Sequence, residues 1–234
     1  MLVAAAVCPC PPLLVPEVAA GAAPELDAAR TACSDALGVL AAARPDLLVV
    51  VGTAGQEERG AYPAGATGSF RGFGVELEVR LGAGDQAERR LPPSLAVGAW
   101  LLDHSRWGSP VEGLGIADSL APGPSREKGR EIAGRAERVA LLAMGDGSAC
   151  RTLKAPGYLD ERAAGFDALA ADALGSADTG ALAGLDVSLA YELKVAGRST
   201  WQVLAGAAED AGLTGRLLYE DAPYGVGYFV ASWS

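Results

Sequence analysis

Histidine is almost absent from this chain, since His104 is the only one in 234 residues. Imidazole is a frequent metal ligand and general base. A single histidine therefore leaves few ligands for an iron or zinc site and only one possible base for a Ser-His-Asp triad. Basic residues are also few, with 19 Lys and Arg against 29 Asp and Glu and a net charge of −10. No Lys/Arg cluster forms a stripe that would follow phosphates, so we expect neither nucleic acid nor an anionic membrane as a partner.

Long apolar runs are missing too, and none approaches the roughly 20 residues that span a bilayer. The apolar start, residues 1–7, has no basic flank and runs into prolines. It therefore predicts a strand rather than a signal peptide. We expect a cytoplasmic protein whose cysteines stay reduced, namely Cys8, Cys10, Cys33 and Cys150. The alternative for Cys8 and Cys10 is a strained bridge across one residue.

Half of the residues are apolar, which is enough to bury a core, and we expect one domain over residues 1–234. Unbroken apolar runs at 1–7, 46–52 and 139–144 are typical of inner strands in a parallel sheet that is covered on both faces. A strand at 75–81 alternates polar and apolar residues, so the sheet should be mixed. The sequence thus predicts an α/β fold with a central mixed, mostly parallel sheet covered by helices on both faces.

The other expected elements follow from periodicity and from capping or breaking residues. Residues 57–74, rich in Gly, Ala and Pro, are expected to form a long surface loop. Further strands are expected at 111–117, 215–220 and 225–231, and helices between Pro24 and Pro45 and at 94–105, 125–138, 160–174, 182–196 and 200–211.

The first candidate site is the loop that ends the first strand. Open parallel sheets gather their chemistry at the carboxyl ends of their strands. Proline at 9, 11 and 12 fixes the backbone, so this loop should hold the thiol of Cys10 in one place. Cys8 lies two residues back on the same face of a strand, so the two thiols could chelate a metal ion. The alternative, which cysteine burial in general favours, is that both are small buried hydrophobic residues.

The second candidate site is the Gly145-Asp146-Gly147-Ser148 turn after the run 139–144. A turn at a strand end exposes side chains, so Asp146 could act as a base or ligand and Ser148 as a nucleophile. Asp146 could instead simply satisfy backbone N–H groups in the turn. A Ser-His-Asp triad would need His104, which falls near a helix end, where histidine commonly complements the dipole.

Several motifs occur in a characteristic order along nearly the whole chain. They are the apolar strand ending in Pro9-Cys10-Pro11-Pro12, the strand 44–52, the turn 145–148, residues 196–207, and the terminal Tyr224-Gly225-Val226-Gly227-Tyr228. With these motifs the chain resembles the class III extradiol ring-cleavage dioxygenases, subunit-B-like, and the Memo-like branch shares the terminal Gly-Tyr strand. The resemblance implies an α/β fold and, in active members, O₂-dependent cleavage of catechols at a non-haem Fe(II) held by two histidines and a glutamate.

The positions that this resemblance assigns to the iron site carry other residues here. The first histidine ligand falls on Cys10, the second within residues 53–55, and the catalytic histidine on Ala149. The nearest candidate for the acidic ligand is Glu192. Because a facial triad needs two imidazoles and a carboxylate, we expect no stoichiometric iron and no other cofactor.

Three functions remain open from the sequence. In the first, the chain keeps a small-molecule cleft at the strand ends without iron chemistry, with Cys8, Cys10, Thr53 and Tyr224 at the cleft. In the second, it is an enzyme of altered chemistry, with Cys10 as thiolate or metal ligand and Asp146 and Ser148 across the cleft. In the third, it is an interaction subunit, because an alanine-rich helical surface could pair with another protein or with a second copy of the chain.

Overall fold

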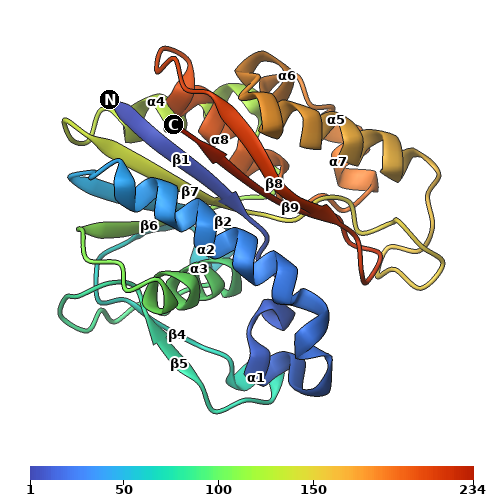
Figure 1. The fold of residues 1–234 in the computed structure, drawn as a ribbon, viewed down its shortest axis with the longest axis horizontal. Coiled ribbons are helices and arrows are strands. Elements are labelled where there is room, and N and C mark those ends of the chain that lie inside the picture. The colour runs from blue at the N-terminus through green and yellow to red at the C-terminus, as the bar shows by residue number, and fades with distance from the viewer.

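A computed structural model describes residues 1–234 and is built on a seven-stranded sheet in the order β3-β6-β2-β7-β1-β9-β8 (Figure 1). The four strands β6, β2, β7 and β1 are parallel, whereas β3, β9 and β8 pair in antiparallel fashion. The predicted mixed, mostly parallel α/β fold is confirmed. The sheet strands are β1 Leu2–Cys8, β2 Leu47–Thr53, β3 Gly60–Tyr62, β6 Val111–Ile116, β7 Val139–Met144, β8 Gly215–Asp221 and β9 Tyr228–Trp233.

The three apolar runs form the centre of this sheet. β1, β2 and β7 each have a neighbour on both sides, so the predicted inner strands are confirmed. Their side chains alternate between two hydrophobic clusters. Ala6, Val50 and Leu142 belong to the cluster on one face, whereas Val49 and Leu141 belong to the cluster on the other. Continuous burial on both faces explains why these strands show no polar alternation.

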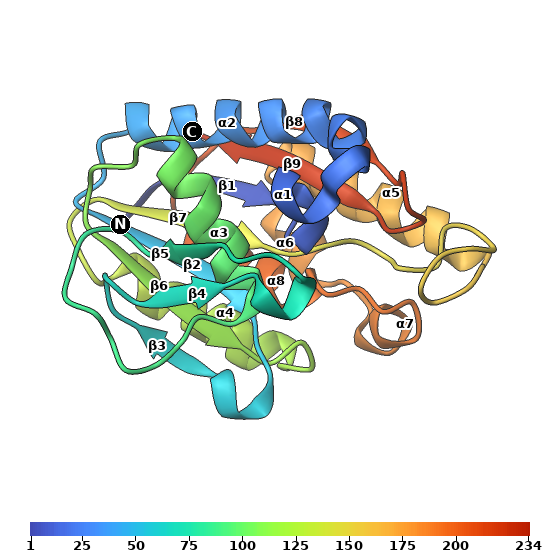
Figure 2. The same ribbon diagram turned by 90° about the horizontal axis from the view of Figure 1, so that it is seen from below.

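Helices cover both faces of the sheet. The long α2 lies on one face of the sheet, where α3 also packs on β2 (Figure 2). On the other face, α8 packs on β1, β2 and β7. No helix here combines the length and the apolar character that crossing a bilayer requires. The helices are α1 Pro16–Ala19, α2 Asp27–Ala42, α3 Pro93–His104, α4 Pro122–Ala133, α5 Arg162–Ser176, α6 Thr179–Ala183, α7 Val187–Glu192 and α8 Arg198–Ala208, with 3-10 turns at Pro12–Leu14, Ala20–Leu26, Gln56–Glu58 and Arg71–Phe73.

Three predicted elements differ from the structure. The strand predicted at 75–81 is shorter and lies outside the central sheet, which is mixed because of β3, β8 and β9. The region 57–74 is not a plain loop, because it contains β3 and β4 (Thr67–Ser69), and β4 pairs with β5 (Glu78–Arg80) in a separate two-stranded sheet. Three-residue strands are too short to produce a readable alternation. The predicted helix 182–196 is split into α6 and α7. The Asp186 carboxylate accepts a hydrogen bond from the N–H of Leu189 at 2.9 Å, so a new helix begins there.

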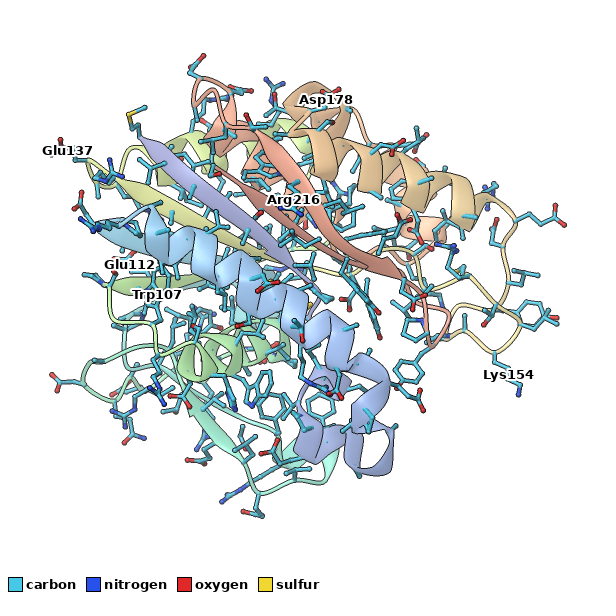
Figure 3. All side chains as sticks on the ribbon, in the orientation of Figure 1. Trp107, Glu112, Glu137, Lys154, Asp178 and Arg216 are labelled. Atoms are coloured by element: carbon cyan, nitrogen blue, oxygen red, sulfur yellow. The ribbon has the colours of Figure 1, made fainter.

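The carboxyl end of the parallel strands can be located from residues that flank β7. Glu137 precedes β7 and Lys154 follows it, and the two lie at opposite ends of the molecule (Figure 3). Because β1, β2 and β6 run parallel to β7, their carboxyl ends face the same way. The loops after these strands therefore meet at one edge, as the sequence predicts.

Close contact with α4 fixes the position of α8. A Cβ atom at Gly129 of α4 would overlap the backbone of Val203 in α8, and one at Gly206 of α8 would overlap the backbone of Arg126. The two helices can approach this closely only because both positions are glycine. The first residue of α8, Arg198, is thereby held beside the strand ends.

Candidate functional site

A pocket opens at the carboxyl edge where the sequence predicts one. Its volume is about 510 Å³, within the range of small-molecule sites. Cys10 after β1 and Thr53 at the end of β2 both line it, as predicted. We call it the strand-end pocket; its lining residues are Cys10, Thr53, Ala54, Gly55, Glu58, Arg59, Pro93, Ser94, Asp118 and Ala196.

A second, larger pocket of about 770 Å³ adjoins the first, and Asp118 and Ala196 line both. We call it the α7 pocket, because most of its wall comes from α7 and the segment that leads into α8. Its lining residues are Asp118, Ser119, Val187, Ser188, Ala190, Tyr191, Glu192, Lys194, Val195, Ala196 and Arg198. The two pockets together give the edge room for a ligand of ordinary metabolite size.

Cys10 is nearly buried, with 9% of its surface exposed. Its backbone N–H donates a hydrogen bond to Asp146 Oδ1 at 2.8 Å, which ties the proline-rich loop to the turn after β7. Burial, and then the negative charge of Asp146, raise the pKa of the Cys10 thiol well above its ordinary value. The thiol therefore stays protonated at neutral pH, a state that is a weak nucleophile and a poor metal ligand.

Asp146 lies beside Cys10 with part of its surface exposed, although it is not among the residues that line either pocket. Burial raises the pKa of this carboxyl to about 7, and the hydrogen bond from the Cys10 N–H limits the rise. The carbonyl of Asp146 also accepts from Gly197 N–H at 2.7 Å, which links the turn to α8. Asp146 thus organises the backbone of two loops and also carries a proton that can be exchanged near neutral pH.

Ser148 does not face either pocket, contrary to the prediction. It is fully buried, and Asp167 of α5 accepts hydrogen bonds from its backbone N–H at 2.8 Å and from its Oγ at 2.7 Å. Arg151 Nη1 pairs with the same carboxylate at 3.0 Å. The turn is folded inward, so that Ser148 supplies hydrogen-bond donors to the buried carboxylate of Asp167. Ser148 is therefore part of a buried hydrogen-bond network and not of the cleft.

Cys8 and Tyr224 also lie away from both pockets. Cys8 is fully buried on the α2 face, where a contact with the Cys33 thiol, followed by burial, raises its pKa. Cys8 and Cys10 belong to the same hydrophobic cluster, as their spacing predicts, but only Cys10 lines a pocket. Tyr224 is half-buried, and burial and the charge of Glu25 raise its pKa. All four cysteines are free.

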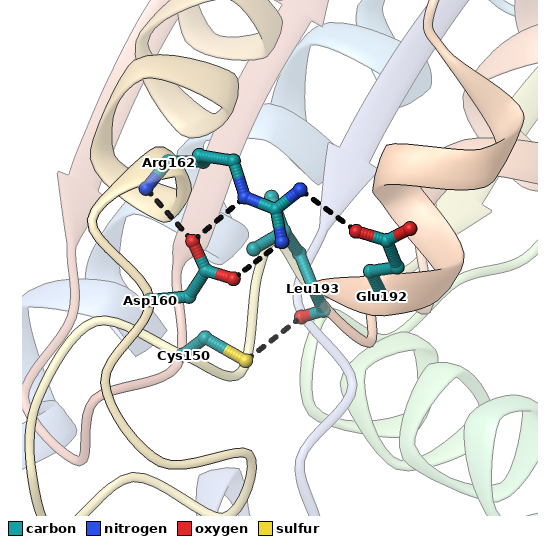
Figure 4. A network of polar contacts seen from close by, with 5 residues as sticks. All are labelled: Cys150, Asp160, Arg162, Glu192 and Leu193. Carbon is teal, nitrogen blue, oxygen red and sulfur yellow. Dashed lines mark hydrogen bonds and ion pairs between the residues drawn. The ribbon is translucent and has the colours of Figure 1, made fainter.

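Glu192 lies at the α7 pocket and is engaged in an ion pair. Arg162 donates from Nη1 to Glu192 at 2.7 Å and from Nη2 to Asp160 at 2.7 Å (Figure 4). Arg162 holds the pKa of Asp160 down at about 2. In the same network the thiol of Cys150 donates to the Leu193 carbonyl at 3.5 Å. Glu192 therefore braces α7 against the start of α5 and does not converge on Cys10.

The residues present do not fit the iron centre that the resemblance implies. Of the positions concerned only Cys10 and Glu192 carry ligand atoms, and these two line different pockets. No group of three His, Cys, Asp or Glu side chains is placed to hold a metal ion. His104 ends α3, where its Nδ1 contacts the Trp100 carbonyl at 2.8 Å and its ring lies 4.1 Å from the Trp100 ring. The site therefore lacks the set of ligands that this iron chemistry requires.

Comparison with known proteins gives the fold but no activity. No protein-family model matches the chain, and no curated protein matches it. Among solved structures, the crystal structure of the uncharacterized protein JW3007 from Escherichia coli K12 is similar, with 14% sequence identity and a TM-score of 0.56 over 99% of each chain. At this identity the likeness establishes a shared fold along the whole length.

Arg198 is a site residue that the sequence does not predict. It is the first residue of α8, only 2% of its surface is exposed, and it lines the α7 pocket. A buried arginine beside a cavity is uncommon and signals a specific partner or ligand. The sequence predicts the helix from residue 200, which left Arg198 in a loop. The Gly197 that precedes it was the available signal for an earlier helix start.

Proposed function

We propose that this chain binds a small organic molecule at the carboxyl edge of its sheet and does not cleave aromatic rings with iron. In this proposal it is a relative of the class III extradiol dioxygenases that keeps the cleft without the iron ligands. The observation that carries the proposal is the strand-end pocket, formed where the loops after β1 and β2 meet. Open α/β sheets bind ligands at this edge.

A fragment screen on ¹⁵N-labelled protein tests the proposal. We expect bound fragments to shift the amide signals of Cys10, Thr53 and Ala196. Ala196 lines both pockets, so Ala196→Phe should fill the junction and abolish that binding. Ala168→Phe is the matched control, because Ala168 is exposed on α5 away from both pockets. Fragments that bind Ala196→Phe as tightly as the unaltered chain would refute the proposal.

The absence of ring cleavage is a separate prediction. After anaerobic loading with ferrous iron and desalting, we expect well under one iron per chain, because the expected ligand positions hold Cys10, residues 53–55 and Ala149. Elemental analysis measures the iron, and an oxygen electrode measures uptake with protocatechuate. One iron per chain together with oxygen consumption and an opened ring would overturn the proposal.

The alternative function, an enzyme that uses Cys10 as a thiolate, is disfavoured by the raised pKa of that thiol. Because burial raises the pKa of this thiol well above its ordinary value, the protonated form predominates at pH 7. We therefore expect iodoacetamide to modify Cys10 slowly at pH 7, as followed by peptide mass spectrometry. Asp146→Asn removes the neighbouring negative charge, so it should speed the reaction. Rapid, stoichiometric alkylation of the unaltered chain at pH 7 would favour the thiolate enzyme instead.

A further inference from the structure

Arg198 is a buried cation that has no carboxylate partner. Its Nη1 donates to the Leu120 carbonyl at 2.8 Å and to Gln202 Oε1 at 2.7 Å, and its Nη2 donates to the Asp118 carbonyl. All three acceptors are neutral. A buried charge normally needs an opposite charge, because neutral acceptors replace only part of its lost hydration. The guanidinium therefore remains short of a negative partner.

Part of this guanidinium remains free to bind a ligand. The Nε–H and one N–H of Nη2 have no acceptor in the chain. The Nε atom has no hydrogen-bond partner but is not fully buried, so it keeps access to solvent. Arg198 also lines the α7 pocket. Two such donors form the flat fork that matches the two oxygens of a carboxylate.

The other charged groups of the α7 pocket leave room for an anion. Lys194 is exposed at the pocket and forms no ion pair within the chain, whereas Glu192 pairs with Arg162, which Asp160 also engages. The Asp118 carboxylate is exposed and accepts from the N–H of Ser119 at 2.6 Å. Asp118 contacts Arg198 through its backbone carbonyl and not through its carboxylate. Burial lowers the pKa of the Arg198 guanidinium, and the charge of the Asp118 carboxylate only partly offsets this, so Arg198 still favours a further negative partner.

The rest of the pocket wall is largely apolar. Val187 and Tyr191 of α7 are 37% and 80% exposed, which is unusual for such side chains, and Ala190 and Val195 complete the wall. Apolar side chains around a few placed polar donors are typical of sites for small organic ligands. A ligand here would meet apolar surface on one side and the Arg198 fork on the other.

We propose that the α7 pocket binds a small organic acid with an apolar body, whose carboxylate accepts hydrogen bonds from Nε–H and Nη2–H of Arg198. Lys194 at the rim adds attraction for the same charge. This inference rests on the proposed function and deepens it by naming the chemical class of the ligand.

The first test compares acids with their neutral amides on the unaltered protein. The probes are benzoate, hexanoate and 3-phenylpropionate, each against its own amide, and inorganic phosphate. We expect each acid to bind at least about tenfold more tightly than its amide, as charge-assisted hydrogen bonds require. In ¹H–¹⁵N spectra the Nε signal of Arg198 should shift with the acids, and phosphate should not compete.

The second test uses variants. Arg198→Lys keeps a charge but removes the fork, so acid binding should weaken by about tenfold or more while amide binding stays the same. Lys194→Met should weaken acid binding by only about twofold to threefold, as expected for an exposed charge. Arg216→Met is the matched control, because Arg216 is exposed on β8 (Figure 3). It should bind like the unaltered chain.

The outcomes separate this inference from the proposed function. Equal binding of acids and amides, full competition by phosphate, or unchanged acid binding by Arg198→Lys would each overturn the acid pocket. If fragments bind the strand-end pocket but no acid binds the α7 pocket, the proposed function stands and this inference fails. If neither pocket takes any ligand, both fail. Should Arg198→Lys not fold, the comparison of acids with amides on the unaltered protein decides.

Discussion

Asp167→Ala is expected to lower the free energy of unfolding by about 3–5 kcal/mol, the usual loss when one partner of a buried ion pair is removed. Asp167 is fully buried, and its carboxylate accepts from the N–H and Oγ of Ser148 and pairs with Arg151. Without it, two buried donors of Ser148 lose their acceptor and Arg151 loses its counter-charge. Urea unfolding followed by tryptophan fluorescence measures the change.

Two further variants make this prediction specific. Asp172→Ala, on the exposed side of the same helix, should change stability by no more than about 0.5 kcal/mol. Ser148→Ala removes a single hydroxyl and leaves Asp167 with its other donors, so it should cost about 1–2 kcal/mol. If Asp167→Ala is as stable as Asp172→Ala, the network does not hold the turn in place.

The inward position of Ser148 shows where the sequence-based prediction of the site reached its limit. A turn after a buried strand normally exposes its side chains, which made Ser148 a candidate nucleophile. Its partner Asp167 follows 19 residues later, and only folding brings the two together. A usable signal was present, because Asp167 shares the buried stripe of α5 with Ala163 and Ala170. An acidic residue on an apolar helix face calls for a buried partner.

The central sheet was predictable because its signal is local. The residues of β1, β2 and β7 are apolar without interruption, and a strand buried on both faces needs that pattern. The parallel order that this pattern predicts also brings Cys10 and Thr53 to one edge of the sheet, where both line the strand-end pocket. The short β3 and β4 were not predictable, because their pairing depends on contacts with β6 and β5 and not on their own composition.

Arg198 shows a second kind of residue that sequence-based prediction misses. In a chain with 19 basic residues, nothing local marks the one that becomes buried. Its burial goes with contacts to the segment before α4, since its guanidinium donates to the carbonyls of Asp118 and Leu120, which lie far from it in the sequence. The position of Arg198 at the pocket therefore depends on tertiary contacts. A sequence pattern within one segment cannot predict such contacts.

Asp146→Asn is expected to stabilise the protein at pH 8 and to flatten its stability between about pH 4 and pH 7. Burial raises the pKa of Asp146 from 3.8 to about 7. Below about pH 4 the carboxyl is protonated in both states and has no effect. As pH rises from 4 to 7, the unfolded chain releases this proton while the folded chain holds it, so stability falls. Above pH 7 the folded chain is ionised too, and the loss levels off.

The full shift corresponds to about 4 kcal/mol, and partial exposure of the carboxyl reduces this to about 2–3 kcal/mol. The amide has no proton to lose, and its oxygen can still accept the Cys10 N–H. The neighbouring Cys10 and Tyr228 do not obscure the effect, because their pKa values are raised and both stay neutral in this range.

Urea unfolding at several pH values from about 4 to 8 measures the effect as the difference between Asp146→Asn and the unaltered chain. This difference should grow with pH up to about 7 and then stay constant. Asp172→Asn, at an exposed carboxyl of α5, serves as the control and should give no such trend. Parallel stability profiles for Asp146→Asn and the unaltered chain would mean that Asp146 ionises freely in the folded protein. It would then also carry its full charge beside Cys10 at pH 7, and Asp146→Asn should speed alkylation of Cys10 at that pH more than the removal of a partly protonated carboxyl would.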